Sequence, residues 1–225
     1  MSGLTNIGDR ILEWLSPERR FAMKLPEDLE EVPFVVLDTE TTGLNPIRDR
    51  ILSIGALRLL GGRIRVNESV EYFLAQDHFD RLSVPIHGIL KTGSSPRMDE
   101  KEGLKSILEY IGDSPVVGHH ISFDRTMIQN ACDRHGLGKF RNPLLDTGTL
   151  YRKSLIKSPL LRKKDQYSLD DLARKYDLSC KDRHTALGDA YITAMAFLHI
   201  LEQLTSKGPL TTRQLLKLGK PGAGN

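Results

Sequence analysis

The sequence predicts an α/β domain in which a central mixed β-sheet is flanked by α-helices. Three observations indicate this: a continuous β-prone run at Phe34–Leu37, a hairpin signal at Gly61-Gly62, and helical patterns that alternate with short strands further along. Strands that come first and then alternate with helices are typical of such a sheet. The length of 225 residues allows one to two domains of ordinary size.

Residues 1–30 differ from the rest of the chain, because their apolar residues recur at helical spacing until Ser16-Pro17 breaks the pattern. We expect a short amphipathic helix and then a charged linker over 17–31. The helix either packs on the main domain or docks a partner. The main domain is expected over 31–206. Residues 207–225 carry four basic residues, no acid and a Gly/Pro-rich end, which predicts a flexible basic tail.

The strands follow in order from Phe34–Leu37, whose wholly apolar run is expected for a strand buried on both faces. Ile51–Leu59 and Arg63–Leu74 lie on either side of Gly61-Gly62, so we expect them to form a hairpin. Two shorter strands are expected at Val116-Val117 and Leu144-Leu145.

Helices are predicted where apolar residues recur at a period of 3.6. Gly136 is expected to terminate one of them as a C-cap, and Ser168 to begin another as an N-cap. The predicted helical patterns are Leu104–Ile111, Met127–Ala131, Ser168–Tyr176 and Ala186–Leu204.

Composition excludes several classes of protein. With 39% hydrophobic and 27% charged residues the chain is not mainly disordered, and its apolar runs are too short to cross a bilayer. The net charge of +3 is too small to indicate nucleic acid by itself. Cys132 and Cys180 cannot build a zinc site alone, and the N-terminus lacks a secretory pattern. We therefore expect a cytoplasmic protein with no membrane partner.

Acidic residues stand at the end of the first apolar strand. Asp38 follows Phe34–Leu37 directly and Glu40 comes two residues later, so both side chains point to the same side. Asp38 alone could cap the following turn, but that leaves Glu40 unexplained. Two like charges at the mouth of a buried strand are costly without a cation. Gly43 lets the chain turn sharply nearby.

Two further acids and a histidine lie in the C-terminal half. Asp124 falls near the start of a predicted helix, where the helix dipole alone could favour it. Asp189 follows His184 by five residues and lies on an otherwise apolar helix face. His184 and Asp189 would not share a helical face, but they converge if His184 lies on the preceding loop. Gly188 indicates that a side chain is excluded there.

Four carboxylates with one nearby histidine favour hard divalent cations, Mg²⁺ or Mn²⁺, over zinc. Two such ions, about 3.5–4 Å apart, stabilise the attacking and leaving oxygens of a phosphodiester displacement. The histidine can take a proton from the attacking water near neutral pH.

Three segments resemble the motifs of the DEDDh exonucleases, the family of the epsilon subunit of bacterial DNA polymerase III. They are Val36–Leu44, Gly118–Asp124 and His184–Asp189, supported by weaker matches at Pro85–Ile89 and Leu145–Thr147. The resemblance covers about residues 33–204. It implies a ribonuclease-H-like fold and 3′→5′ hydrolysis of a nucleic acid that releases nucleoside 5′-monophosphates. Our leading hypothesis is that the substrate is DNA, in proofreading or repair. Thr185 stands where a sister group has Tyr, which favours the His type.

The resemblance also implies roles for individual residues. It assigns two divalent cations to Asp38, Glu40, Asp124 and Asp189, and it assigns the general base to His184. The 3′-terminal nucleotide would contact Thr41 through its backbone and hydroxyl, Leu44 as an apolar wedge, and His87 and His119 along the pocket. His120 departs from the family, where Asn is usual.

The implied partners are single-stranded or frayed 3′ ends of DNA, with RNA possible, and a polymerase subunit. A basic run between Tyr151 and Lys164 contains no acid between these residues, and it could guide the phosphate backbone. Alone, such a run would be a solvated loop. Its position beside the third motif favours the functional role.

Three alternatives remain. One is an exoribonuclease that trims short RNA or tRNA 3′ ends. Another is a non-catalytic nucleic-acid-binding or polymerase-adaptor protein, although the presence of all four acids and the histidine argues against it. The third, an endonuclease of the ribonuclease H type, fits the His184–Asp189 spacing poorly. The sequence leaves the oligomeric state and the pathway open.

Overall fold

The structure, a computed structural model, describes the chain apart from residues 1–24, 79–82, 91–95, 156–165 and 223–225. The predicted N-terminal helix and most of the basic run therefore lie outside the described residues. Among the residues that are described, no helix is both long and apolar enough to span a bilayer.

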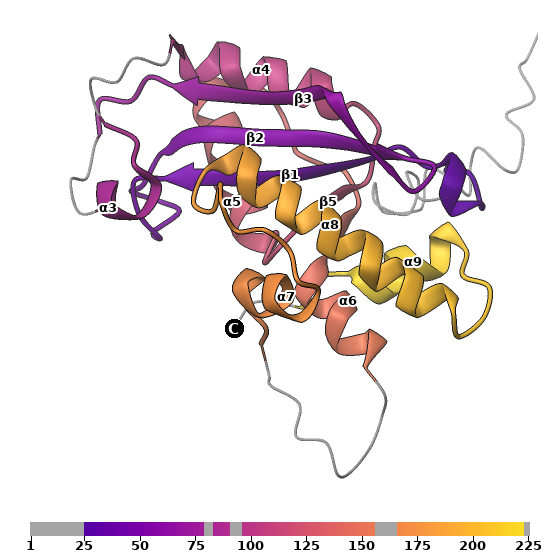
Figure 1. The fold of residues 1–225 in the computed structure, drawn as a ribbon. Coiled ribbons are helices and arrows are strands. Elements are labelled where there is room, and N and C mark those ends of the chain that lie inside the picture. Colours follow the sequence, from indigo (N-terminus) through magenta and orange to yellow (C-terminus); the bar gives the residue numbers. More distant parts are fainter. Residues whose placement is uncertain (1–24, 79–82, 91–95, 156–165, 223–225) are drawn as a thin grey trace, which may run out of the picture.

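A six-stranded mixed sheet forms the centre of the fold (Figure 1). Its strands stand in the order β4-β3-β2-β1-β5-β6. β1, β2 and β3 form an antiparallel meander, β5 and β6 run parallel to β1, and β4 runs parallel to β3. The strands are β1 Phe34–Thr41, β2 Ile51–Leu60, β3 Arg63–Leu74, β4 Arg97–Met98, β5 Val116–Gly118 and β6 Leu144–Asp146. The predicted mixed sheet and its hairpin are confirmed.

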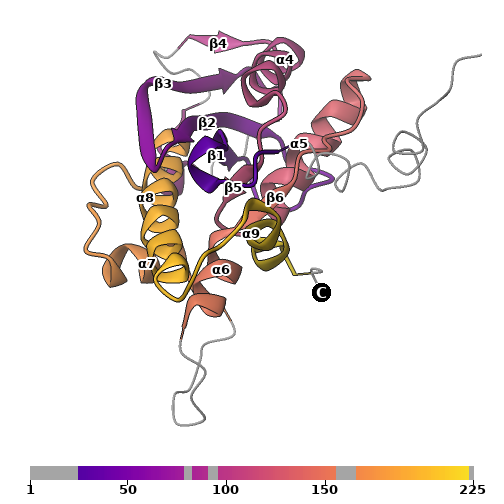
Figure 2. The same ribbon diagram turned by 90° about the vertical axis from the view of Figure 1, so that its right-hand side faces the viewer.

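Helices cover both faces of this sheet, as Figure 2 shows for α4 and α5 on one side and α7 and α8 on the other. β1 supplies both cores by alternation: Val35 and Leu37 pack with α4 and α5, while Phe34 and Val36 pack with α8. The helices are η1 Leu29–Glu31, α3 Val84–His87, α4 Glu100–Ile111, α5 Ser122–His135, α6 Thr147–Ser154, α7 Leu169–Lys175, α8 Ala186–Thr205 and α9 Thr212–Gly219.

The sequence prediction for the C-terminal tail is wrong over residues 212–219, which form α9 instead of a flexible segment. Thr211 caps this helix in a reciprocal capping box with Gln214, and Leu215 is fully buried in the core beside α6 and α8. A single apolar face suffices to dock a two-turn helix when the core offers a matching surface. The main domain therefore extends beyond the expected boundary at residue 206.

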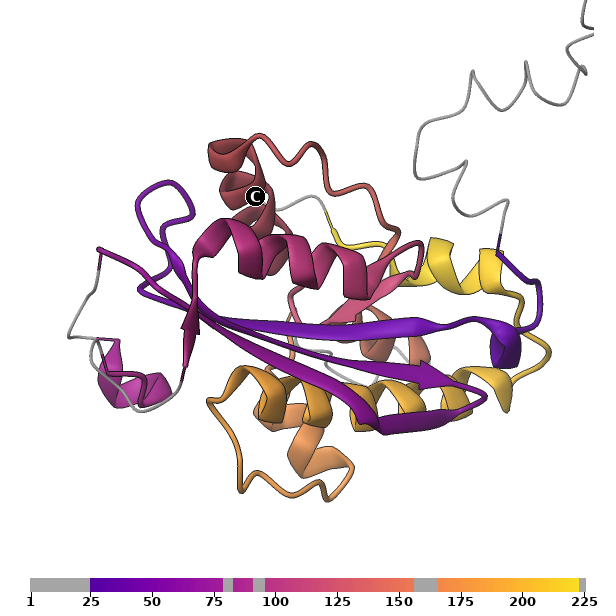
Figure 3. The same cartoon turned by 90° about the horizontal axis from the view of Figure 1, so that it is seen from above.

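The N-terminal described segment meets this C-terminal helix. The backbone N–H and the hydroxyl of Thr212 both donate to the carbonyl of Glu27, each at 3.0 Å. Figure 3 shows η1 and α9 at one end of the sheet, and α3 with the loop after β1 at the opposite end, where α8 begins.

β1 continues beyond the predicted end at Leu37 as far as Thr41, so Asp38 and Glu40 lie within the strand. Pairing with β2 continues through this polar part, with Asp38 opposite Gly55 and Glu40 opposite Ser53. Backbone hydrogen bonds to β2 thus extend β1 beyond its apolar residues. The apolar residues alone did not predict this longer strand.

Candidate active site

Three carboxylates converge where β1 passes the first turn of α8. Asp38, Glu40 and Asp189 offer oxygen atoms that all lie within 4.8 Å of one another. Asp38 and Glu40 share one face of β1, as their spacing predicted, and Asp189 comes from α8. Carboxylate oxygens at this separation are a donor set suited to Mg²⁺ or Mn²⁺.

Two glycines allow close backbone packing around the first turn of α8. A Cβ atom on Gly55, the β2 partner of Asp38, would lie 2.2 Å from the backbone nitrogen of Leu187, so Gly55 lets α8 approach the sheet beside Asp38. A Cβ on Gly188 would lie 1.9 Å from the carbonyl oxygen of Asp182, so Gly188 lets the preceding loop pack against the helix. Side chains are therefore excluded at both positions.

Asp124, the fourth predicted acid, lies in the first turn of α5 and is 5% exposed. Its Oδ1 accepts a hydrogen bond of 2.6 Å from the Thr39 hydroxyl, on the opposite face of β1 from Asp38. Asp124 therefore stands outside the three-carboxylate group, though close enough to raise the pKa of Asp38.

Burial raises the pKa of all four acids, and repulsion from the others adds to this for Asp38 and Glu40. Burial, followed by the charges of Asp124 and Asp189, raises the pKa of Asp38 well above its ordinary value. Burial and Asp189 raise the pKa of Glu40 to about 8. Burial raises the pKa of Asp124 to about 7 against the opposing Thr39 hydrogen bond, and burial also raises the pKa of Asp189. A cation at this position would offset the repulsion.

Arg183 is a site residue that the sequence reasoning missed. Its side chain is 18% exposed and forms ion pairs with Asp170 of α7, at 2.7 Å, and with Asp189. The Arg183 charge lowers the pKa of Asp38, Glu40 and Asp189 against the larger effect of burial. In the sequence it stands in a mixed-charge stretch, Lys181–His184, that resembles an ordinary solvated loop.

His184 lies on the loop before α8, as predicted, with a left-handed backbone (φ 67°). Its backbone N–H donates to Asp189 Oδ1 at 3.2 Å, and its exposed imidazole has Nδ1 3.5 Å from the Arg183 guanidinium. The structure thus brings the His184 backbone to the carboxylates, while the imidazole lies toward solvent. Use of this imidazole as a base requires the side chain to turn toward the cluster.

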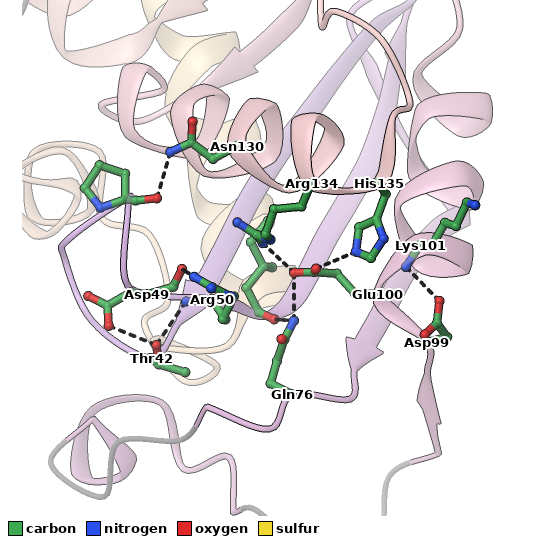
Figure 4. Close-up of polar contacts among 12 residues, drawn as sticks. Thr42, Asp49, Arg50, Gln76, Asp99, Glu100, Lys101, Asn130, Arg134 and His135 are labelled. Atoms are coloured by element: carbon green, nitrogen blue, oxygen red, sulfur yellow. Dashed lines mark hydrogen bonds and ion pairs between the residues drawn. The ribbon is translucent and has the colours of Figure 1, made fainter.

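The loop after β1 presents Leu44 to solvent. Leu44 is 85% exposed, whereas Thr41 is buried and donates its hydroxyl to the Gly43 carbonyl at 2.8 Å. Asp49 fixes the loop by accepting hydrogen bonds from the Thr42 hydroxyl (Figure 4) and from the Asn45 backbone N–H.

The same loop is tied to α5, because Asn130 donates its side-chain amide to the Pro46 carbonyl at 2.7 Å. Ile47 is 80% exposed near the loop tip. A loop held this firmly while exposing two large apolar side chains is suited to contact bases rather than to pack the core.

The two predicted pocket histidines occupy different settings. His87 ends the short helix α3, is buried, and has Nε2 2.9 Å from the Ser83 hydroxyl; burial lowers its pKa. His119 follows β5, and burial together with the neighbouring His120 lowers its pKa to about 4. His119 Nδ1 lies 2.9 Å from the Thr147 hydroxyl, which links it to the predicted Leu145–Thr147 element.

The sequence of this chain matches a family of known proteins. The family model RNase_T, described as exonuclease, matches residues 35–197. The chain is 32% identical over 186 residues to the epsilon subunit of DNA polymerase III of Aquifex aeolicus, covering 83% of this chain and 89% of that protein.

The chain belongs to this exonuclease family. The predicted family, with its DNA polymerase III epsilon-like members, is thereby confirmed. The chain is also 34% identical over 188 residues to the PolC-type DNA polymerase III of Thermotoga maritima. That match covers 84% of this chain but spans only 13% of the length of the relative.

Solved structures confirm the ribonuclease-H-like fold. Exonuclease X in complex with 5′ overhanging duplex DNA superposes with a TM-score of 0.59 at 22% identity, covering 83% of this chain and 99% of that one. Escherichia coli Exonuclease I in complex with a dA16 oligonucleotide gives a TM-score of 0.64 at 18% identity, covering 83% and 42%.

Proposed function

We propose that this protein removes nucleotides one at a time from the 3′ end of DNA, in proofreading or repair, with two Mg²⁺ or Mn²⁺ ions. The observation that carries the proposal is the convergence of Asp38, Glu40 and Asp189 within 4.8 Å. Their raised pKa values mark a cluster whose negative charges are only partly compensated by Arg183. Both features fit a divalent cation held by these three residues together with Asp124.

When bound, divalent cations stabilise the charge that develops on the phosphoryl oxygens and make a bound water more acidic. In the proposed reaction the water oxygen bonds to phosphorus, and the bond from phosphorus to the 3′ oxygen of the remaining strand breaks. His184, turned from its exposed position, accepts the proton of the water. The leaving 3′ oxygen takes a proton from solvent water, so the products are a nucleoside 5′-monophosphate and a strand shortened by one nucleotide that ends in a 3′-hydroxyl.

The substrate contacts proposed for this reaction lie around the loop after β1. Leu44 would pack against the terminal base, Thr41 would contact the nucleotide through its backbone, and His87 and His119 would line the nucleotide pocket. The Thr41 hydroxyl is already engaged by Gly43, so its contact would have to come from a reoriented hydroxyl or from the main chain. The low pKa of His119 makes it a neutral hydrogen-bonding group at pH 7.

Single-stranded or frayed 3′ ends are the proposed substrates, because one strand must reach the partly buried carboxylates between β1 and α8. The relatives named as polymerase III chains support a polymerase partner in the cytoplasm. The free thiols of Cys132 and Cys180 are compatible with that reducing compartment. Attack on RNA is tested in the same assay.

The experiment is product analysis on matched 5′-labelled and 3′-labelled single strands of DNA and RNA, with Mg²⁺, Mn²⁺ or EDTA. We expect a metal-dependent ladder from the 5′ label and release of the 3′ label as a mononucleotide, with DNA degraded faster than RNA. Asp38→Asn should abolish both signals. Asp99→Asn is the matched control, since it alters a surface aspartate that caps α4 and keeps a good capping residue.

Release of the 5′ label first, or cleavage at internal bonds, contradicts the proposed reaction. Faster attack on RNA overturns the DNA preference and supports an exoribonuclease. Folded wild-type protein that binds the strands without cutting them supports the non-catalytic adaptor.

A further inference from the structure

Arg183 reaches into the carboxylate cluster from the loop before α8. Its Nε lies 2.7 Å from Asp170 Oδ1, and its NH1 pairs with Asp189 Oδ2. The side chain is largely buried, at 18% exposure, whereas Asp170 is 53% exposed and Asp189 only 8%. The guanidinium therefore connects a surface acid of α7 with a buried acid of the site.

Both oxygens of Asp189 are engaged by this loop. Oδ2 pairs with the guanidinium, and Oδ1 accepts the backbone N–H of His184 at 3.2 Å. The carboxylate that would contribute a ligand from α8 is therefore bound by its own chain. The positive charge of Arg183 also lowers the pKa of Asp38 and Glu40, so Arg183 stabilises the ionised form of all three carboxylates.

We propose that Arg183 is a positioning residue that acts as an internal counter-ion, competing with the divalent cation for Asp189 and giving way when the cation binds. The inference rests on the metal site of the proposed function. A guanidinium and a divalent cation on the same carboxylate repel each other strongly in a largely buried site. Asp170 offers Arg183 a partner outside the site, so the guanidinium can release Asp189 without losing every ion pair.

Displacement of Arg183 would also affect His184, the next residue. Nδ1 of the His184 imidazole lies 3.5 Å from the Arg183 guanidinium. If the guanidinium moves away from Asp189, its contact with the His184 imidazole is lost as well. Metal binding and the turning of the proposed base are thereby coupled through one residue.

The test is Mn²⁺ binding to the full chain without nucleic acid, measured by isothermal titration calorimetry, for the wild type, Arg183→Lys and Arg183→Gln. We expect Arg183→Gln to bind Mn²⁺ about tenfold more tightly, within the range of ordinary site-to-site coupling. Arg183→Lys keeps the charge but has no planar fork to reach both acids, so its affinity should fall between the two. Arg174→Gln is the matched control, an exposed arginine paired only with Asp171 among the described contacts, and should bind like the wild type.

Thermal unfolding in EDTA gives the second readout. Arg183→Gln should unfold at a lower temperature than the wild type without metal, and saturating Mn²⁺ should close most of that gap. A purely structural arginine predicts weaker metal binding together with lower stability, and that result overturns the proposal, as does an unchanged affinity. If Arg183→Gln does not fold, Arg183→Lys provides the test. Tighter Mn²⁺ binding than the wild type supports the proposal, and equal or weaker binding overturns it. Absence of Mn²⁺ binding in every protein overturns the metal site itself along with this inference.

Discussion

Two buried acidic sites in this fold, one around Glu100 and one formed by Asp38, Glu40 and Asp189, differ in how the charge of their carboxylates is compensated. Glu100, at the start of α4, is 8% exposed and lies 2.7 Å from both Arg134 NH2 and His135 Nε2, with the Gln76 amide at 2.9 Å (Figure 4). Burial raises the pKa of Glu100, but these hydrogen bonds outweigh it, and the pKa ends below its ordinary value.

The carboxylates of Asp38, Glu40 and Asp189 show the reverse, because a single arginine faces three acids and their pKa values are raised. The Glu100 group contains its own donors and cations, so it holds α4 to α5 without any added ion. The three-carboxylate group has too few donors and cations to stabilise the ionised forms of its acids. Burial of acids therefore marks a functional site only where compensation by the protein is incomplete.

The largest effect is expected from Asp38→Asn. Loss of this carboxylate should lower kcat by about 10³-fold or more, comparable to or beyond the removal of one charge-stabilising group in other enzymes. Because the change also relieves repulsion among the acids, the unfolding temperature without metal should stay the same or rise. Steady-state kinetics and thermal melts in EDTA check both. Retention of most activity would remove Asp38 from the proposed ligands.

His184→Ala should come next, with a loss of kcat of about 10²–10⁴-fold, the range for a positioned general base. The imidazole is exposed, so the melting temperature should change little. The pH dependence of kcat should flatten on its acid side in the variant. A wild-type rate that does not vary with pH would refute the role of His184 as base.

The stability of the metal-free protein should fall as the pH rises through the raised pKa values. Between pH 4.5 and about 8 folded Glu40 keeps a proton that the unfolded chain releases, and Asp124 behaves likewise up to about 7. The folded state therefore binds more protons, and the free energy of unfolding decreases as the pH rises over this range. Urea titrations across this range should show it. Glu40→Gln or saturating Mg²⁺ should reduce the slope, and an equal slope in all three would contradict the assignment of the effect to these carboxylates.

Glu100→Gln is the counterpart in the compensated group. It should cost about 2 kcal/mol of unfolding free energy at pH 7, because Arg134 loses its charged partner in a largely buried site. The lowered pKa of Glu100 means that this stabilisation is present above its unfolded pKa and disappears as the pH falls. The difference between the two proteins should therefore shrink in acid, while kcat stays at the wild-type level. If Glu100→Gln lowered kcat as much as Asp38→Asn does, the conclusion that only the second site is functional would be wrong.

The smallest effect is expected from Leu44→Ala, which should lower kcat/KM by about tenfold on duplex ends, in line with the loss of one apolar contact. Leu44 is 85% exposed, so stability should not change. Val66→Ala is the matched control, an apolar residue 64% exposed on β3. Equal kinetics for both variants would remove Leu44 from the substrate contacts.

Much of this fold can be predicted from patterns in the sequence. The helical pattern over Ala186–Leu204 predicts α8, which extends one residue further, and Gly136 has the left-handed conformation (φ 65°) expected of a C-cap. The spacing of Asp38 and Glu40 correctly indicates that both face one place. Such features depend on neighbours in the sequence, so local patterns suffice to predict them.

The remainder depends on contacts between distant segments. α9 is stable because Leu215 enters a core formed by other elements, which a short basic segment does not reveal. Arg183 belongs to the site only through Asp170, thirteen residues earlier, and the first turn of α8. The hydrogen bond between Asp124 and Thr39 joins residues 85 positions apart, so no spacing rule could place that carboxylate.

The contact between Glu27 and Thr212 has a consequence for truncation of the domain. Two hydrogen bonds from Thr212 to the Glu27 carbonyl join the segment before β1 to the first residue of α9. Removal of α9 would therefore free the segment that leads into β1, and it would also leave the core without Leu215. The C-terminal helix thus secures the beginning of the domain as well as its end.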